Sequence, residues 1–193
     1  MIQSLLLSIR YLLFSLFFLG FLYTGAVTII AELFYPEKAN GSLLKKDGVV
    51  LGSELLAQEF RTDKYFWPRP SAAKYSTLPS GASNFGATDS NLSREIQKRK
   101  MIYADPLLYP GRPPADLLFA SGSGLDPHIS PQAAFFQIQR IARARKLPIG
   151  QVEVLRKLVE DHTEGPQMLI LGVPRVNVLQ LNLALDRQWG MEP

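Results

Sequence analysis

Residues 120–134 read Ala-Ser-Gly-Ser-Gly-Leu-Asp-Pro-His-Ile-Ser-Pro-Gln-Ala-Ala, and this stretch decides how the second half of the chain folds. Its two glycines predict a tight loop, because glycine adopts backbone conformations that other residues avoid. Ser130 followed by Pro131 is typical of a helix N-cap and the first helical position. The apolar run before the loop, residues 116–119, is interpreted as a strand. Free backbone N–H groups at such a helix start suit an anion or a protein contact.

Helices are predicted on the C-terminal side of this loop, at 131–146, 150–162 and 180–189, with a strand at 175–179 before the last one. In the first helix, apolar side chains recur at helical spacing and predict a buried face. The basic residues of its last two turns suit the negative end of the helix dipole and are expected on a solvated face; they are Arg140, Arg143, Arg145 and Lys146.

On the N-terminal side, Val49 to Leu51 predicts a short strand, and residues 61–92 form a long irregular stretch. Four aromatic residues between Tyr65 and Tyr75 argue that this stretch is ordered, since that composition buries well. A charged helix is expected at 91–100. Together these elements predict an α/β fold, with α+β as the alternative, in a single small soluble domain.

The segment from Tyr11 to Ala31 carries no charged residue over 21 positions. A helix of that length rises about 31 Å, enough to cross a hydrocarbon core of about 30 Å. A cleaved signal peptide is the alternative, but the apolar core is too long for one and no cleavage site follows. We therefore expect a transmembrane helix at 1–34, a connector at 35–48 and the soluble domain at 49–193.

Small residues recur within this span and predict a face on which another membrane helix packs, although such residues are also simply frequent in these helices; they are Gly20, Thr24, Gly25 and Thr28. The distribution of charge leaves the orientation open. Three lysines follow the span while Arg10 and the amino terminus precede it, and a positive-inside count would place the domain in the cytoplasm. The mild, mixed charge beyond the span argues against a nucleic-acid surface.

The chemistry of an enzyme is largely missing. The chain has no cysteine and only two histidines, so no metal site of recognised spacing is expected. Ser121 or Ser123 with Asp126 and His128 could suggest a serine hydrolase, but Ala120 stands where a nucleophile elbow needs its first glycine. No phosphate-binding loop and no Asp-Lys-Thr-Gly phosphorylation sequence exists, so the chain is not expected to hydrolyse ATP by itself.

Several blocks, in this order behind one N-terminal span, resemble the C subunit of the Kdp potassium-transporting P-type ATPase. The 120–134 stretch is the most similar of them. The others are Thr24-Gly25, Tyr35-Pro36, Ala39 to Leu43, Leu51 to Gln58, Arg69 to Ala72, Ser80 to Asn84, and Arg175 through Asp186. The resemblance covers nearly the full length of the chain.

The resemblance implies a small, non-catalytic subunit of an ATP-driven potassium-uptake complex in a bacterial inner membrane. Its partners would be a channel-like A subunit, an ATP-hydrolysing B subunit and a small F subunit. ATP and potassium would be handled by the complex, with no cofactor bound by this chain alone. The family's soluble domain lies on the periplasmic face, above the ion entrance.

Two roles follow from the resemblance. In the first, the domain caps the A subunit and stabilises the assembly through a docking surface; the residues that would form it are Arg69, Pro70, Ser71, Ser83, Asn84, Ser121, Gly122, Ser123, Gly124, Asp126 and His128. In the second, the chain is a catalytic chaperone that raises the affinity of the B subunit for ATP, with Gly52, Ser53 and Gln58 near the nucleotide. A membrane-anchored periplasmic serine hydrolase is the alternative from another class.

Overall fold

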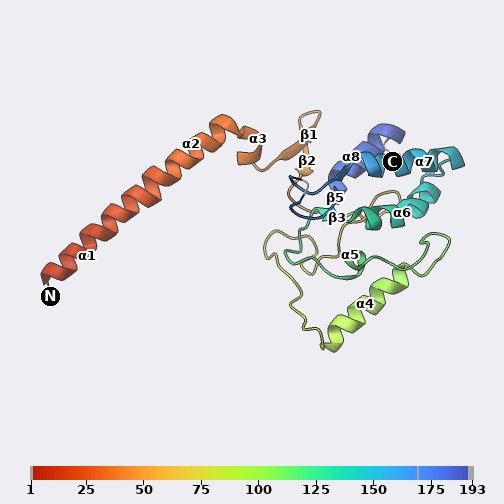
Figure 1. The fold of residues 1–193 in the computed structure, drawn as a ribbon, viewed down its shortest axis with the longest axis horizontal. Coiled ribbons are helices and arrows are strands. Elements are labelled where there is room, and N and C mark those ends of the chain that lie inside the picture. The colour runs from red at the N-terminus through yellow and green to blue at the C-terminus, as the bar shows by residue number, and fades with distance from the viewer. Residues whose placement is uncertain (1, 169, 191–193) are drawn as a thin grey trace. The chain divides into compact units, whose positions relative to one another are not determined.

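The computed structural model describes residues 2–168 and 170–190. The chain divides into two compact units, residues 1–53 and residues 54–193. Figure 1 shows both units along the chain.

The first unit begins with a continuous helix, Ile2–Phe34, long and apolar enough to cross a membrane. It consists of α1 (Ile2–Ser15), a π-helical segment η1 (Leu16–Tyr23) and α2 (Thr24–Phe34). None of its side chains is buried, as expected for a surface that faces lipid. This helix is the membrane anchor that the sequence predicts, and it extends beyond the 21 uncharged residues at both ends.

A short helix and a hairpin complete the first unit: α3 (Pro36–Ala39), β1 (Leu43–Lys46) and β2 (Val49–Ser53). The two strands pair antiparallel. Asp47 and Gly48 join them with positive φ angles of 51° and 79°, the geometry that a two-residue hairpin turn requires. The domain boundary expected at residue 49 falls inside this hairpin.

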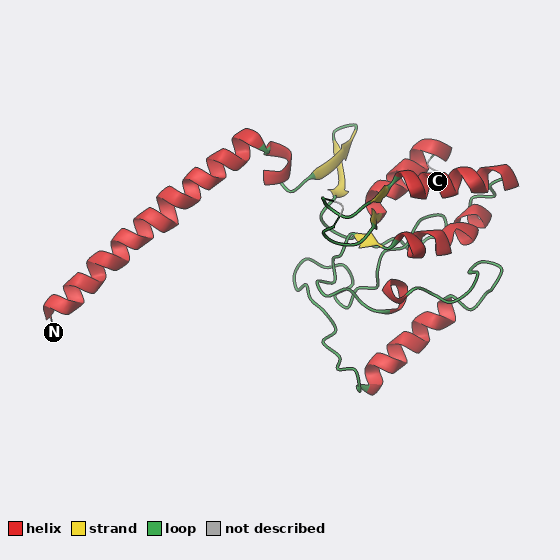
Figure 2. Ribbon diagram, in the orientation of Figure 1, coloured by secondary structure: helices red, strands yellow, loops and turns green. Residues whose placement is uncertain are grey.

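The second unit combines five helices with a three-stranded sheet within the described residues: α4 (Ser90–Ile102), α5 (Ala115–Leu118), β3 (His128–Ile129), α6 (Pro131–Ala144), α7 (Ile149–Asp161), β4 (Thr163–Glu164), β5 (Arg175–Asn177) and α8 (Val178–Trp189). The strand order is β3–β5–β4, and both pairings are antiparallel. Helices and strands are therefore mixed in the α+β manner, as Figure 2 shows.

The strand predicted at 116–119 is wrong, because this run forms the single helical turn α5. Its adjacent Leu117 and Leu118 are both buried. Consecutive side chains of a strand point to opposite faces, so a strand could not bury both against one core. A helical turn can, and Asp116 then occupies the first turn, where a negative charge is favoured.

The core lies among α6, α7, α8 and the sheet, with aromatic side chains from the irregular stretches around it. Tyr103, Tyr109 and Phe136 form a cluster with ring centroids 5.0 to 5.8 Å apart. Phe66 in the 61–92 stretch is fully buried, so the aromatic part of this stretch packs into the core. The predicted buried face of 131–146 is confirmed by Ile138 and Ile141.

The solvated face predicted for the basic residues of α6 is wrong for two of them. Arg140 and Arg145 are only 2% and 5% exposed. Arg140 donates hydrogen bonds to the carbonyls of Asp63 (2.6 Å) and Tyr65 (2.9 Å) and lies over the Trp67 ring. The irregular 63–67 segment has no strand partner, so its carbonyls need donors, and buried arginines supply them.

Candidate functional site

The loop at 120–130 is the point where the separate sequence blocks meet. The Ser121 N–H donates to the carbonyl of Pro70 at 3.0 Å, and the Ala57 N–H donates to the carbonyl of Leu125 at 2.9 Å. The Val178 N–H donates to the carbonyl of Pro127 at 3.0 Å. Three distant segments are thus bonded through their backbones to one loop, which fixes its shape.

At Gly124 the loop packs closely against the 71–81 segment. A Cβ built there would lie 2.8 Å from the carbonyl oxygen of Gly81 and 3.2 Å from the hydroxyl of Ser71. Its φ of +72° also lies in the region that favours glycine. Ser71 in turn accepts a hydrogen bond from the Tyr75 N–H at 2.9 Å. The 71–81 loop and the 120–130 loop therefore fit together only because residue 124 has no side chain.

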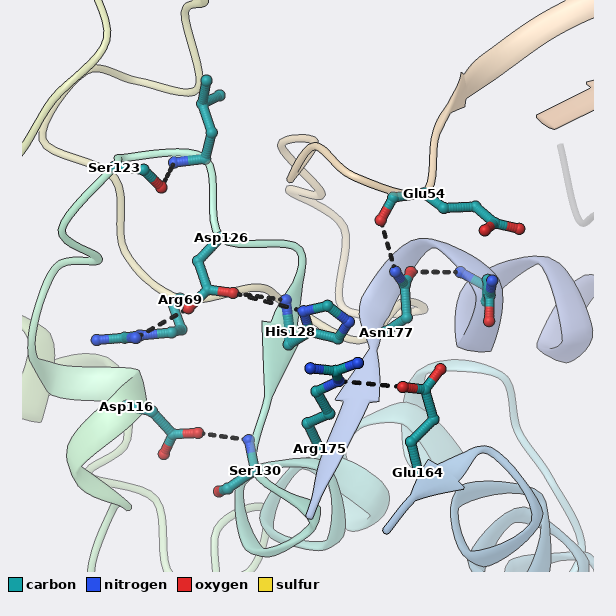
Figure 3. Close-up of polar contacts among 12 residues, drawn as sticks. Glu54, Arg69, Asp116, Ser123, Asp126, His128, Ser130, Glu164, Arg175 and Asn177 are labelled. Atoms are coloured by element: carbon teal, nitrogen blue, oxygen red, sulfur yellow. Dashed lines mark hydrogen bonds and ion pairs between the residues drawn. The ribbon is translucent and has the colours of Figure 1, made fainter. Parts of the chain in front are cut away.

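Asp126 holds the far end of the loop (Figure 3). Its carboxylate accepts hydrogen bonds from the Arg69 guanidinium at 2.9 Å and from the His128 N–H at 3.0 Å, and the His128 ring lies 3.8 Å away. Burial acts to raise the pKa of the Asp126 carboxyl, but the bonds from His128 and Arg69 outweigh it, so that pKa lies below its usual value. The carboxylate is charged and occupied at neutral pH.

The outer edge of β3 is closed by two carboxylates. Asp126 accepts from the His128 N–H, and Asp116 accepts from the Ser130 N–H at 2.7 Å, as Figure 3 shows. These two N–H groups are two residues apart and lie on the same side of the strand, away from β5. An exposed edge strand is a template for pairing with another chain, and here its donors are already taken.

A cleft of about 510 Å³ lies beside this edge. Its ionisable lining residues are Arg69, Asp116, Asp126, His128 and Arg175. Arg175 is paired with Glu164 at 3.0 Å, and Arg69 with Asp126. The cleft therefore presents paired charges of both signs.

A serine hydrolase is not assembled here. The Ser123 hydroxyl accepts a hydrogen bond from the Leu125 N–H at 3.1 Å, which closes a local turn. Ser121 is 2% exposed. No hydrogen bond joins the His128 ring to either serine in the part of the chain that the structure describes. A nucleophile must contact its base, so this geometry offers no activated serine.

The remaining predicted residues lie outside 120–130 in the sequence and are divided between the two units. Ser53 ends β2 in the first unit, next to Gly52, and its hydroxyl donates to the Gly41 carbonyl at 2.7 Å. Gln58 belongs to the second unit and is half-buried. Ser83 is half-buried, and Asn84 is exposed with a φ of 54°.

The membrane-helix residues satisfy their own polar groups. The Thr24 hydroxyl donates to the Gly20 carbonyl, and the Thr28 hydroxyl donates to the Thr24 carbonyl at 2.9 Å. Gly25 has open space around its Cα. Each of the two hydroxyls therefore has a partner within its own helix, and the helix face formed by these residues is small and apolar.

Asn177 and Asp116 are the structural residues that the sequence reasoning missed at this site. The Asn177 amide donates to the Glu54 carbonyl at 2.8 Å and accepts from the Gln180 N–H, so it caps α8 and ties down the 54–58 segment. An asparagine directly before an apolar helical pattern is an N-cap signal, and that signal was available. Nothing in the sequence pattern marks Asp116 as the partner of Ser130.

Among the described residues, no group of three or more histidine, aspartate or glutamate side chains is placed to hold a metal ion. The polar groups around the loop are instead used in pairs, as caps and ion pairs. The arrangement therefore forms a rigid, shaped surface.

Comparison with known proteins gives a consistent result over nearly the full chain. The family model described as "KdpC: K+-transporting ATPase, c chain" matches residues 5–187. A potassium-transporting ATPase KdpC subunit of Leptospira interrogans is 45% identical over 185 residues, which cover 96% of this chain and 94% of that protein. The subunits of the same name from Gemmatimonas aurantiaca and Methylococcus capsulatus are each 50% identical, covering 90% and 86% of this chain and 87% and 88% of their own lengths.

Proposed function

Since this chain belongs to the KdpC family, the c chain of the K+-transporting ATPase, we propose that it assembles and stabilises that complex by docking on a channel-like subunit at the ion entrance. It is an accessory subunit of a potassium-transporting complex, anchored by its N-terminal helix. The proposal includes three partner chains: a channel-like A subunit, an ATP-hydrolysing B subunit and a small F subunit. It also assigns the binding of ATP and potassium to those chains.

The observation that carries the docking role is the fixed shape of the 120–130 loop. The Asp126 carboxylate and the Ser123 hydroxyl accept hydrogen bonds from N–H groups of the loop, and Asp116 accepts one from the Ser130 N–H. Gly122 and Ser123 are exposed at the tip. A surface that is rigid before binding loses little conformational entropy on association, and preorganisation favours affinity. This supports recognition of a partner surface.

Bulky substitutions at the exposed tip test the docking role. Gly122→Arg together with Ser123→Arg is expected to leave the chain folded, by circular dichroism, and to lose recovery of the other subunits in a mild-detergent pull-down. Glu160→Arg on α7 is the control and should keep full recovery. Full recovery with the tip variant would place the interface elsewhere and contradict the proposal.

The second candidate, a catalytic chaperone for the ATP-hydrolysing subunit, makes a different prediction. Gln58→Ala would then raise the KM for ATP of the purified complex while all subunits stay present in normal proportion. Under the docking proposal the same variant leaves the KM for ATP unchanged. The KM measured on the complete complex therefore separates the two roles.

We propose that the domain lies on the periplasmic side, and the cysteine-free chain allows a direct test. Ser123→Cys places an exposed thiol on the domain, and Gln3→Cys places one in the first turn of the N-terminal helix, before its uncharged span. In intact cells a membrane-impermeant maleimide should label position 123 and should reach position 3 only after lysis. The reverse pattern would place the domain in the cytoplasm.

A further inference from the structure

The hairpin loop between β4 and β5 carries the most concentrated apolar surface of the second unit. Residues 165–174 contain no charged residue. Four of its apolar side chains are more than half exposed: Met168 82%, Ile170 80%, Leu171 56% and Val173 76%. Single exposed apolar residues are common, but a contiguous group of this kind marks an interaction surface.

Hydrogen bonds within the loop join three of its residues. The Gln167 N–H donates to the Leu171 carbonyl, and the Leu171 N–H donates back to the Gln167 carbonyl, both at 2.8 Å. The Ile170 N–H donates to the Gln167 carbonyl at 3.2 Å. Backbone groups that leave water for lipid must bond internally, because lipid offers no partner. These three bonds lower the number of backbone groups that would enter a bilayer interface unpaired.

The charged base of the hairpin fits the headgroup region of a bilayer. Arg175 and Glu164 form an ion pair at 3.0 Å where the loop leaves the sheet, and both side chains are about half exposed. The apolar tip is thus followed by a charged base, the order of polarity met on passing from hydrocarbon to headgroups. The tip also lacks Trp, Tyr and Arg, the residues that dominate protein–protein hot spots.

The chain itself brings a bilayer within reach. Residues 35–53 join the membrane helix to the second unit, and even fully extended they span at most about 65 Å. A tethered surface meets its target at high effective concentration, so weak binding by a few aliphatic side chains suffices. The bilayer crossed by the chain's own helix is the surface that is always available to this loop.

We propose that the β4–β5 hairpin is a second membrane contact, whose tip enters the interfacial region of the bilayer that the N-terminal helix spans. Met168, Ile170, Leu171 and Val173 supply the buried apolar surface. The contact adds a second point of attachment to the domain and limits its orientation relative to the bilayer. Val173 and Arg175 also line the cleft beside the 120–130 loop, so this contact lies next to the proposed docking surface.

Single cysteines in this cysteine-free chain test the proposal. Ile170→Cys reports on the hairpin tip, and Ile149→Cys is the matched control: also an isoleucine, 93% exposed, and in the same unit. Each full-length variant is labelled with an environment-sensitive fluorophore and reconstituted into phosphatidylcholine vesicles, with or without lipids that carry a nitroxide near the headgroup end of the acyl chain.

The label at position 170 is expected to emit at shorter wavelength and to lose most of its fluorescence to nitroxide lipid, while the label at 149 keeps its fluorescence. Adding Leu171→Asp to the Ile170→Cys chain should reverse that loss, because a carboxylate disfavours the interface. Equal quenching at 170 and 149 would overturn the proposal. So would a label at 170 that nitroxide lipid never quenches but that the other subunits protect from a soluble quencher, which would assign the tip to a protein partner.

Discussion

At the scale of the residue, the absence of a side chain at Gly124 allows two loops to pack closely. Gly124→Ala places a Cβ 2.8 Å from the Gly81 carbonyl oxygen at a φ of +72°. We expect a loss of roughly 1–3 kcal/mol in the free energy of unfolding, from backbone strain and the forced separation of the loops. The measurement is denaturant unfolding of the detergent-solubilised chain.

Gly122→Ala, two residues away, is the control for that experiment. Residue 122 has no heavy atom within 4 Å of an added Cβ and no positive φ. The substitution should leave the free energy of unfolding within about 0.5 kcal/mol of the parent chain. Similar losses for both variants would mean that the loop tolerates no methyl group anywhere, and that the contact with Gly81 is not the cause.

Asp126 gives the chain a pH dependence of known sign. Its pKa is lower in the folded chain than in the unfolded one, so the stabilisation is present above about pH 4 and is lost as the pH falls through the folded pKa. The difference in unfolding free energy between the parent chain and Asp126→Asn should therefore shrink as the pH falls from 5 toward 3.

Arg69→Met is the matched partner variant for this pH series. Because Arg69 donates to the Asp126 carboxylate, its removal should take away part of the same acid-sensitive contribution, and the double variant should cost less than the two single losses added together. Strict additivity of the two losses would show that the pair is not coupled.

At the scale of the element, the backbone of Phe66 and Trp67 pairs with no strand and is hydrogen-bonded by side-chain amides instead. Asn182 on α8 accepts from the Phe66 N–H at 2.8 Å and donates to the Phe66 carbonyl at 3.0 Å. Gln137 on α6 does the same for Trp67, at 2.8 and 3.2 Å. Two buried amides thus pair with consecutive residues of the 63–67 segment and attach it to two helices.

Asn182→Ala removes both bonds and leaves the buried N–H and carbonyl of Phe66 without a partner. Unpaired buried polar groups cost about 1–3 kcal/mol each, so we expect a loss of about 2–4 kcal/mol in the free energy of unfolding. Gln180→Ala, on the same helix, keeps both bonds to Phe66 and should change stability little. A loss for Asn182→Ala no larger than that of the control would contradict the clamp. Unfolding followed by tryptophan fluorescence gives both values.

Helices are predicted best from the sequence where apolar residues recur along one helix face over several turns. The helices at 131–146 and 150–162 are confirmed within two residues, with Ser130 as N-cap, because 3.6-residue periodicity and caps are local signals. The pattern places Phe135 on the buried face, whereas the fully packed aromatic residue is its neighbour Phe136. Arg140 and Arg145 are wrongly predicted to be solvated because their partners, at 63–65, lie far away in sequence.

At the scale of the whole molecule, the core belongs to the second unit alone. The buried apolar side chains lie between Ala57 and Leu185. We therefore expect a fragment of residues 54–193 to purify without detergent and to unfold cooperatively, as followed by near-UV circular dichroism and thermal unfolding. A fragment that is soluble but unfolds without cooperativity would show that the first unit contributes to the core.

A shorter fragment, residues 69–193, is the control. It lacks Phe66 and Trp67, and it leaves Asn182, Gln137 and Arg140 buried without their backbone partners. Loss of a large aromatic residue from a core costs about 3–5 kcal/mol, and unpaired buried polar groups add to it. This fragment should be unfolded or aggregate, although it keeps every helix from α4 to α8.

The sequence by itself determined the membrane helix, the helical pattern of the domain and the family, because length, periodicity and ordered sequence blocks are properties of the chain read along one dimension. It also singled out the 120–134 stretch as the most informative part of the chain. Only the tertiary structure decided that residues 116–119 form a helical turn, that two arginines are buried, and which partners Asp126, Asp116 and Asn177 bond. The physical reason is that a polar side chain takes its role from the partner it meets, and those partners come from distant segments.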